Sequence, residues 1–165
     1  MSKSKEKYNK ELLNIIEEKK EEWSKNVKDL SPLIRSKNAH DMADAQALGL
    51  SYRTMLLDEV SYFLSELTEE QKFLKEFKRD RFCLYKTGLL PDGTRPKNMA
   101  KNPLVGNQKT TGGQIEMVMS GDLSDFEYTC EILINMVEHL REHIRTIDQY
   151  MYAIKNRLEL FAVFK

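Results

Sequence analysis

The longest regular pattern of apolar residues lies at the C-terminal end of the chain. Between residues 126 and 161, apolar side chains recur at steps of four and three, which is the spacing of a heptad repeat. A 3.5-residue repeat held over about five heptads keeps one helix face turned toward a partner. We therefore expect a long helix that is built to associate, although the repeat alone does not separate pairing within the chain from pairing between subunits. The seam consists of Phe126, Cys130, Leu133, Val137, Leu140, Ile144, Ile147, Met151, Ile154, Leu158 and Phe161.

Two more helices are predicted ahead of it. Residues 4–29 mix Lys and Glu around a few apolar positions, and this helix should end at Ser31-Pro32 because a proline ring disfavours helix at the residue before it. A second helix should begin near Asn38 and continue to Gly88. We favour one long helix here, although Thr68 and Gln71 could form a capping box that divides it. Its seam again steps by four and three, with two charged members: Leu56, Val60, Phe63, Leu67, Glu70, Leu74, Phe77, Arg81 and Leu84.

A long loop is predicted between the second and the last helix. Residues 88–113 hold three of the four prolines and five of the seven glycines, and Leu90-Pro91-Asp92-Gly93 is typical of a turn. A loop of this length is uncommon unless it binds a ligand or stays disordered until something binds. Residues 115–119 fit either a short strand or a turn of helix. Ser124 and Glu127 form a capping box at which the last helix should begin.

The composition favours the all-α class. Charged residues make up 32% of the chain and aromatic residues 9%, which suits long solvated helices better than a sheet. We expect long helices in an oligomer-forming bundle, with residues 1–35 as an N-terminal amphipathic helix or appendage and residues 36–165 as the main helical domain. No apolar run approaches the roughly 20 residues that span a bilayer, and the Lys-rich start lacks the apolar stretch of a signal peptide. A soluble, cytoplasmic protein is therefore expected, without a disulfide between Cys83 and Cys130.

The net charge of zero hides a strongly basic segment. Residues 72–109 contain ten basic and three acidic residues, an excess that attracts polyanions. Phe73, Phe77, Phe82 and Tyr85 are interleaved with these cations and could stack on bases, although Phe77 also belongs to the second seam. A solvated helix face followed by a flexible basic loop is the alternative. The basic residues are Lys72, Lys75, Lys78, Arg79, Arg81, Lys86, Arg95, Lys97, Lys101 and Lys109.

The sequence indicates no catalytic centre, metal site or cofactor site. His139 and His143 are four residues apart, but no third and fourth ligand follows a metal-binding spacing, so we expect both to be exposed polar residues outside the seam. Gly106 and Gly112-Gly113 match no phosphate-binding loop. No serine or cysteine stands in a nucleophile motif. The acidic residues of the second helix fit a solvated face: Asp41, Asp44, Asp58 and Glu59.

Two segments carry a resemblance to a known family. The second helix closes with the run from Lys78 to Gly88, in which a pair of basic residues separated by one position stands four residues before a tyrosine and close to a glycine. A polar linker follows, and the C-terminal helix ends with the run from Tyr150 to Phe161, which contains Ile-Lys and a final Phe. Over residues 38–163, this order of parts resembles the UvsY recombination mediators of T4-like bacteriophages.

The resemblance implies a helical protein that assembles into a homo-oligomeric ring in the host cytoplasm. Such a protein binds single-stranded DNA and helps a phage recombinase to replace the single-strand-binding protein. Arg79 and Arg81 match the family's DNA-contacting basic pair, whereas residues 1–35 have no counterpart and the loop 89–113 is longer and more basic. We therefore predict a non-enzymatic mediator, with a helical scaffold or adaptor for an acidic protein partner as the alternative. The predicted DNA-binding residues are Lys75, Lys78, Arg79, Arg81, Tyr85, Lys86, Lys97, Lys101 and Lys109.

Overall fold

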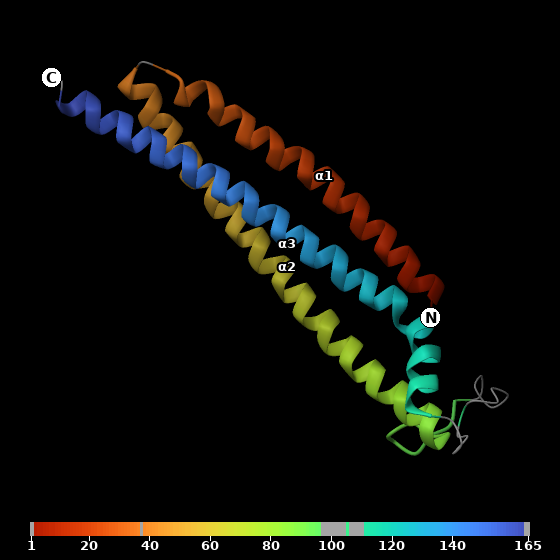
Figure 1. Cartoon of the computed structure of the whole chain (residues 1–165). Helices are drawn as coiled ribbons and strands as arrows, with labels where there is room; N and C mark the ends of the chain where they lie inside the picture. Colours follow the sequence, from red (N-terminus) through yellow and green to blue (C-terminus); the bar gives the residue numbers. More distant parts are fainter. Residues whose placement is uncertain (1, 37, 97–104, 106–110, 164–165) are drawn as a thin grey trace. The chain divides into compact units, whose positions relative to one another are not determined.

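The chain folds into long helices. The computed structural model describes residues 2–36, 38–96, 105 and 111–163, and these residues form three α-helices and no strand (Figure 1). The helices are α1 (Ser2–Ile34), α2 (Ala39–Thr87) and α3 (Gly112–Val163). This arrangement confirms the predicted all-α class.

The end of α1 lies beyond the predicted stop. Pro32 is inside the helix, which closes with hydrogen bonds from the Arg35 and Ser36 backbone N–H groups to carbonyls three residues earlier, at 3.2 Å each. The prediction of an end at Ser31-Pro32 is therefore wrong by about one turn. Packing outweighs the bond that proline cannot make: Leu30 is buried, and the guanidinium of Arg157 donates to the backbone carbonyls of Ile34 and Ser36.

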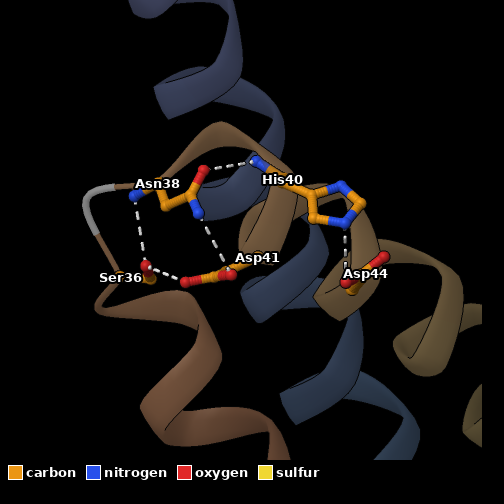
Figure 2. Close-up of polar contacts among 5 residues, drawn as sticks. All are labelled: Ser36, Asn38, His40, Asp41 and Asp44. Carbon is orange, nitrogen blue, oxygen red and sulfur yellow. Dashed lines mark hydrogen bonds and ion pairs between the residues drawn. The ribbon is translucent and has the colours of Figure 1, made fainter.

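Polar side chains cap the start of α2, as Figure 2 shows. The backbone N–H of His40 donates to Asn38 Oδ1 at 3.0 Å. The Ser36 hydroxyl donates to Asp41 at 2.6 Å and accepts the Asn38 backbone N–H at 3.1 Å. Exposed His40 lies 3.8 Å from Asp44 one turn further on. These bonds satisfy groups that a first helical turn leaves without partners, and the Asp41 carboxylate is favoured near the positive end of the helix. The predicted start near Asn38 is confirmed.

The other end of α2 also follows the sequence. The helix is continuous from Ala39 to Thr87, so Thr68 and Gln71 do not divide it. Gly88 has a φ of 80° and donates its N–H to the Leu84 carbonyl at 2.8 Å, which is a glycine stop. The predicted turn follows, with the Gly93 N–H donating to the Leu90 carbonyl at 2.9 Å.

The start of α3 corrects the sequence prediction. The helix begins at Gly112, where Thr111 and Gln114 form a reciprocal capping box: the Thr111 N–H donates to Gln114 Oε1 at 3.0 Å, and the Gln114 N–H donates to Thr111 Oγ1 at 3.4 Å. The box predicted at Ser124 and Glu127 does not exist, because Ser124 lies inside the helix and donates to the Gly121 carbonyl. Residues 115–119 are helical. Of the predicted basic loop 88–113, residues 97–104 and 106–110 lie outside the described part.

The chain divides into two compact units, each built from pieces of several helices. The first unit comprises Met1–Glu6 and Leu67–Glu131, and the second comprises Lys7–Glu66 and Ile132–Lys165. This division cuts through the helices. Residues of α1, Trp23 and Leu30 among them, are fully buried in the second unit.

In the second unit, α1, α2 and α3 lie side by side (Figure 1). Lys19 of α1 pairs with Glu59 of α2, and Arg53 of α2 pairs with Asp148 of α3 at 2.7 Å. Gly49 allows a close approach between α2 and α3, because an added Cβ would lie 2.6 Å from the sulfur of Met151. The core includes Trp23, Leu30, Met42, Leu56, Phe63, Leu133, Leu140 and Ile147.

The predicted seam of α3 is mostly a core seam of this chain. Phe126 and Cys130 are buried in the first unit, and the members from Leu133 to Ile154 are buried in the second, apart from half-buried Met151. Leu158 is half-buried, and Phe161 is 38% exposed. The heptad repeat therefore serves packing within the chain over most of its length.

Candidate nucleic-acid interface

The exposed cations of α2 gather on one helix face in the first unit. Lys72, Lys75, Arg79, Phe82 and Lys86 follow one another at steps of three and four and are all exposed. Residues at these spacings lie on the same side of a helix. Exposed Lys78 flanks them, four residues before Phe82. We call this surface the cationic stripe, and its charged members are Lys72, Lys75, Lys78, Arg79 and Lys86.

Two acidic residues, Glu76 and Asp80, lie beside the stripe, and exposed Glu76 stands four residues after Lys72 and three before Arg79. Arg79 contacts its neighbour Asp80, with guanidinium nitrogens 3.1 and 3.2 Å from Asp80 Oδ1. The Arg79 side chain remains 68% exposed. In the part of the chain that the structure describes, no carboxylate holds the ammonium groups of the four stripe lysines in an ion pair.

Arg81 has a different environment from Arg79. It lies on the buried side of α2, its side chain is 20% exposed, and its Nε is 3.7 Å from Asp122 of α3. Its guanidinium carbon lies 4.8 Å from the centre of the Phe77 ring. The ion pair of Arg81 with Asp122 thus joins α2 to α3, whereas its cation–π contact with Phe77 lies within α2. The resemblance to UvsY treats Arg79 and Arg81 as a pair, but the structure exposes only Arg79.

Tyr85 does not present its ring to a ligand. The residue is 2% exposed, and its hydroxyl donates to Asp122 Oδ2 at 3.0 Å. Burial raises the pKa of Tyr85, and the hydrogen bond to Asp122 adds to this rise. The ring packs with Leu84, Val105, Ile115, Met119 and Leu123. Tyr85 is therefore a core residue in this conformation and offers no face for base stacking.

Among the four interleaved aromatic residues, Phe82 is the one that lies within the stripe. It is 40% exposed. Phe73 is 43% exposed, but its ring stacks on Phe77 at a centroid distance of 6.1 Å and contacts Phe126 at 5.3 Å. Phe77 also packs against the core cluster that contains Tyr85. The sequence alone could not separate these roles, because they depend on which side of α2 faces α3.

The charged seam position Glu70 also has a partner from a distant part of the chain. Lys5 of α1 donates to Glu70 Oε1 at 2.6 Å, with side chains 14% and 17% exposed. The same ammonium lies 5.3 Å from the centre of the Phe126 ring. Nearby Cys130 is buried, and burial raises the pKa of its thiol, so it packs as a small apolar residue.

The two histidines of α3 are half-buried, which corrects the expectation of exposed positions. Their Nε2 atoms are 3.1 Å apart, and the His139 ring lies 6.5 Å from Trp23. Burial lowers the pKa of both, with a further contribution from Lys20 at His139. No group of three potential metal-ligating side chains occurs within the described residues.

The predicted DNA-binding residues thus fall into three groups. Lys75, Lys78, Arg79 and Lys86 lie together on the stripe, whereas Arg81 and Tyr85 contact Asp122 on the other side of α2. The positions Lys97, Lys101 and Lys109 lie outside the described residues. Lys72 is not among the predicted DNA-binding residues, although its three-and-four spacing with Lys75, Arg79 and Lys86 was a readable signal. Phe82 shares this spacing and was predicted only as a ring that could stack on bases.

Comparisons with known proteins add no assignment. Neither models of protein families, nor curated proteins, nor solved structures match this chain. Within the described residues, none of the helices combines the length and apolar character needed to cross a bilayer.

Proposed function

We propose that the chain binds single-stranded nucleic acid, with single-stranded DNA as the ligand, through the cationic stripe. The observation that carries the proposal is the regular row of exposed cations on α2 with the exposed Phe82 ring among them. Lysine and arginine side chains contact phosphates, and a ring among them stacks on a base. Neither contact depends strongly on base identity, so binding with little sequence preference is expected.

The dimensions of the stripe suit several nucleotides. The 14 helical steps from Lys72 to Lys86 span about 21 Å at about 1.5 Å per residue. A strand with stacked bases passes about six phosphates over that distance, at about 3.4 Å each. A single stripe with five cations therefore binds weakly, and several copies of the chain on one strand raise the avidity by about 10² to 10⁴.

The full proposal is a homo-oligomeric recombination mediator. It supposes that several copies hold one strand and help a recombinase to displace a single-strand-binding protein, without making or breaking a bond. The order of parts shared with the UvsY mediators supports it, as does the position of Arg79 on an exposed cationic surface at the end of α2. An adaptor that presents the stripe to an acidic protein is the second candidate, since the same lysines would pair with carboxylates.

A salt titration with a fluorescent oligonucleotide tests the proposal. The logarithm of the association constant should fall with the logarithm of the salt concentration at a slope of about −0.7 per phosphate contact. Lys75→Ala and Lys86→Ala should each flatten the slope by about 0.7. Lys25→Ala, a matched change of an exposed lysine on α1, should leave the slope as it is.

Phe82→Ala tests the stacking contact separately. It should weaken binding by about 1–3 kcal/mol and leave the salt slope unchanged, because the ring carries no charge. An oligonucleotide that fails to bind even at low salt would refute the nucleic-acid proposal and favour the adaptor. Binding that persists undiminished in a Lys72, Lys75 and Lys86 triple alanine variant would show that the stripe is not the site.

A further inference from the structure

A second regular stripe runs along α2 within the second unit, and it carries no charge. Its positions follow one another at steps of four and three, and every one of them is exposed. A leucine stands at every seventh residue, and those three leucines are 52%, 39% and 37% exposed. We call this surface the leucine stripe, and its members are Ala43, Ala47, Leu50, Thr54, Leu57, Ser61 and Leu64.

The leucine stripe lies away from the core of its own unit. Glu59, which pairs with Lys19 of α1, is two residues after Leu57 and therefore about 200° around the helix from it. The core residues of α2 in this unit are other residues: Met42, Ala45, Leu56, Val60 and Phe63. Folding of the single chain thus accounts for one apolar seam of α2 and leaves the second without an explanation. Charged residues make up 32% of the chain, so seven consecutive exposed heptad positions without a charge need an explanation.

The polar members of the leucine stripe are suited to burial. The Thr54 hydroxyl donates to the Leu50 carbonyl at 3.0 Å, and the Ser61 hydroxyl donates to the Leu57 carbonyl at 2.9 Å. Both donors are satisfied within the helix, so removing them from water leaves no hydroxyl hydrogen without an acceptor. What these two residues present to a partner is then mainly their small size, which lets helices approach closely.

From these observations we infer that the leucine stripe is a self-association surface, on which α2 of a second copy of this chain packs in parallel. Leucine is the residue that parallel two-stranded coiled coils favour at the d position of the heptad, where each leucine meets its equivalent on the other helix. The inference deepens the proposed function by naming the contact surface of the proposed oligomer. It rests on that proposal only for the expectation of an oligomer and does not depend on nucleic-acid binding.

The charges beside the leucine stripe favour the parallel orientation. Arg53 immediately precedes Thr54 of the leucine stripe, and exposed Asp58 immediately follows Leu57. In a parallel coiled coil, two such flanking positions five residues apart face each other across the seam, which places Arg53 opposite Asp58 of the second copy. Arg53 is 40% exposed and already holds Asp148 at 2.7 Å, and its guanidinium has donors for a second carboxylate. An antiparallel pair would instead bring the acidic edges of the two stripes together, with Asp44 and Asp58 on both sides.

The expected contact is small. The 21 helical steps from Ala43 to Leu64 measure about 32 Å, and a helix is about 10 Å wide, so the interface falls below the roughly 1,200 Å² of strong complexes. Self-association should therefore depend on concentration. An open groove lined by Ser51, Thr54, Met55, Asp58, Glu59 and Tyr62 borders the stripe and can receive side chains of the second copy.

Sedimentation of the full chain between about 1 and 100 μM tests this surface. The wild type should shift from monomer to dimer or higher species as its concentration rises. Leu50→Glu with Leu57→Glu should weaken association by at least about 10-fold, because it places charge in a desolvated seam. Tyr152→Glu, which changes a 68% exposed residue of α3 in the same unit, is the matched control. A wild type that stays monomeric throughout, or a Tyr152→Glu variant that dissociates while the leucine variant does not, would overturn the inference.

Disulfide trapping tests the orientation. In a chain carrying Cys83→Ser and Cys130→Ala, single cysteines at Leu50→Cys and Leu57→Cys should each cross-link two copies, because equivalent positions meet in a parallel pair. Lys25→Cys on exposed α1 should not. Failure of either leucine position to cross-link would contradict the parallel seam.

The two proposals fail separately. The leucine variant should bind a short oligonucleotide with the salt slope of the wild type, and the triple alanine variant of Lys72, Lys75 and Lys86 should associate like the wild type. Loss of oligonucleotide binding by the first, or of association by the second, would show that the two surfaces are not independent and would refute the assignment of separate roles.

Discussion

Replacing Arg81 by Ala is expected to destabilise the first unit, whereas replacing Arg79 by Ala is not. Arg81 is 20% exposed, 3.7 Å from Asp122 and 4.8 Å from the centre of the Phe77 ring. Arg79 is 68% exposed and contacts only the adjacent Asp80 among the described residues. The two arginines differ by two positions in sequence, which turns them to different sides of α2.

The magnitude follows from the contacts that each substitution removes. A cation–π contact contributes about 0.5–2 kcal/mol, depending on how dry it is. The ion pair to Asp122, whose side chain is 32% exposed, adds about 0.2–1 kcal/mol after solvent screening. Arg81→Ala should therefore lower the free energy of unfolding by about 1–3 kcal/mol. Asp122 keeps its hydrogen bond from Tyr85, so no carboxylate is left without a donor. Arg79→Ala should stay within about 0.5 kcal/mol of the wild type.

Urea unfolding followed by far-ultraviolet circular dichroism measures both variants. Arg81→Met is the useful control, because it keeps the aliphatic stem over Phe77 and removes only the charge, so it should lie between the wild type and Arg81→Ala. The oligonucleotide titration then gives the opposite order: Arg79→Ala should flatten the salt slope by about 0.7, and Arg81→Ala should change it less. An Arg81→Ala variant as stable as the wild type, or one that loses more of the slope than Arg79→Ala, would refute the separation of roles.

Three further predictions concern stability. Because burial lowers the pKa of His139 and His143, the unfolded chain binds protons that the folded chain does not. The free energy of unfolding should therefore fall as the pH drops below about 6.5. Fluorescence of the single tryptophan during urea unfolding measures this dependence, which should be weaker in a His139→Gln, His143→Gln variant. Gly121→Ala should stabilise the chain by about 0.5–1 kcal/mol in thermal unfolding, because Gly121 is inside α3 and nothing lies within 4 Å of an added Cβ; destabilisation would contradict the helical assignment there. Leu140→Ala should cost about 2–5 kcal/mol and Phe161→Ala much less, since the first is fully buried and the second 38% exposed; equal losses would place Phe161 in a core.

The two ends of α2 were predictable because each depends on residues next to it. Asn38 caps the start through its own neighbours, and Gly88 ends the helix through its positive φ. The start of α3 was not predictable in this way, because Thr111 with Gln114 and Ser124 with Glu127 both fit the same capping pattern. Burial of Ile115, Met119 and Leu123 against α2 decides between them, and that packing involves distant parts of the chain.

The charged residues of the α2 seam show the same division between local and distant causes. Steps of three and four placed Glu70 and Arg81 on the seam, and both are partly buried. Their partners were not readable, because Lys5 is 65 residues from Glu70 and Asp122 lies on another helix. For this reason the predicted site included Arg81 and Tyr85, although the structure shows that both contact Asp122.

Heptad spacing occurs in this chain both on a buried seam and on an exposed helix face, and only the burial of the residues distinguishes the two. The α3 seam predicted association, and it is used within the chain, where Leu140 and Ile147 are fully buried and could meet another copy only if the second unit opened. The leucine stripe of α2 has the same spacing and a weaker apolar content, yet its members are exposed. A three-helix unit needs one seam from each helix, so a second seam on α2 exceeds what the fold requires. The expectation of self-association thus moves from the more apolar repeat to the less apolar one, because only an exposed surface can bind a second copy without unfolding the first.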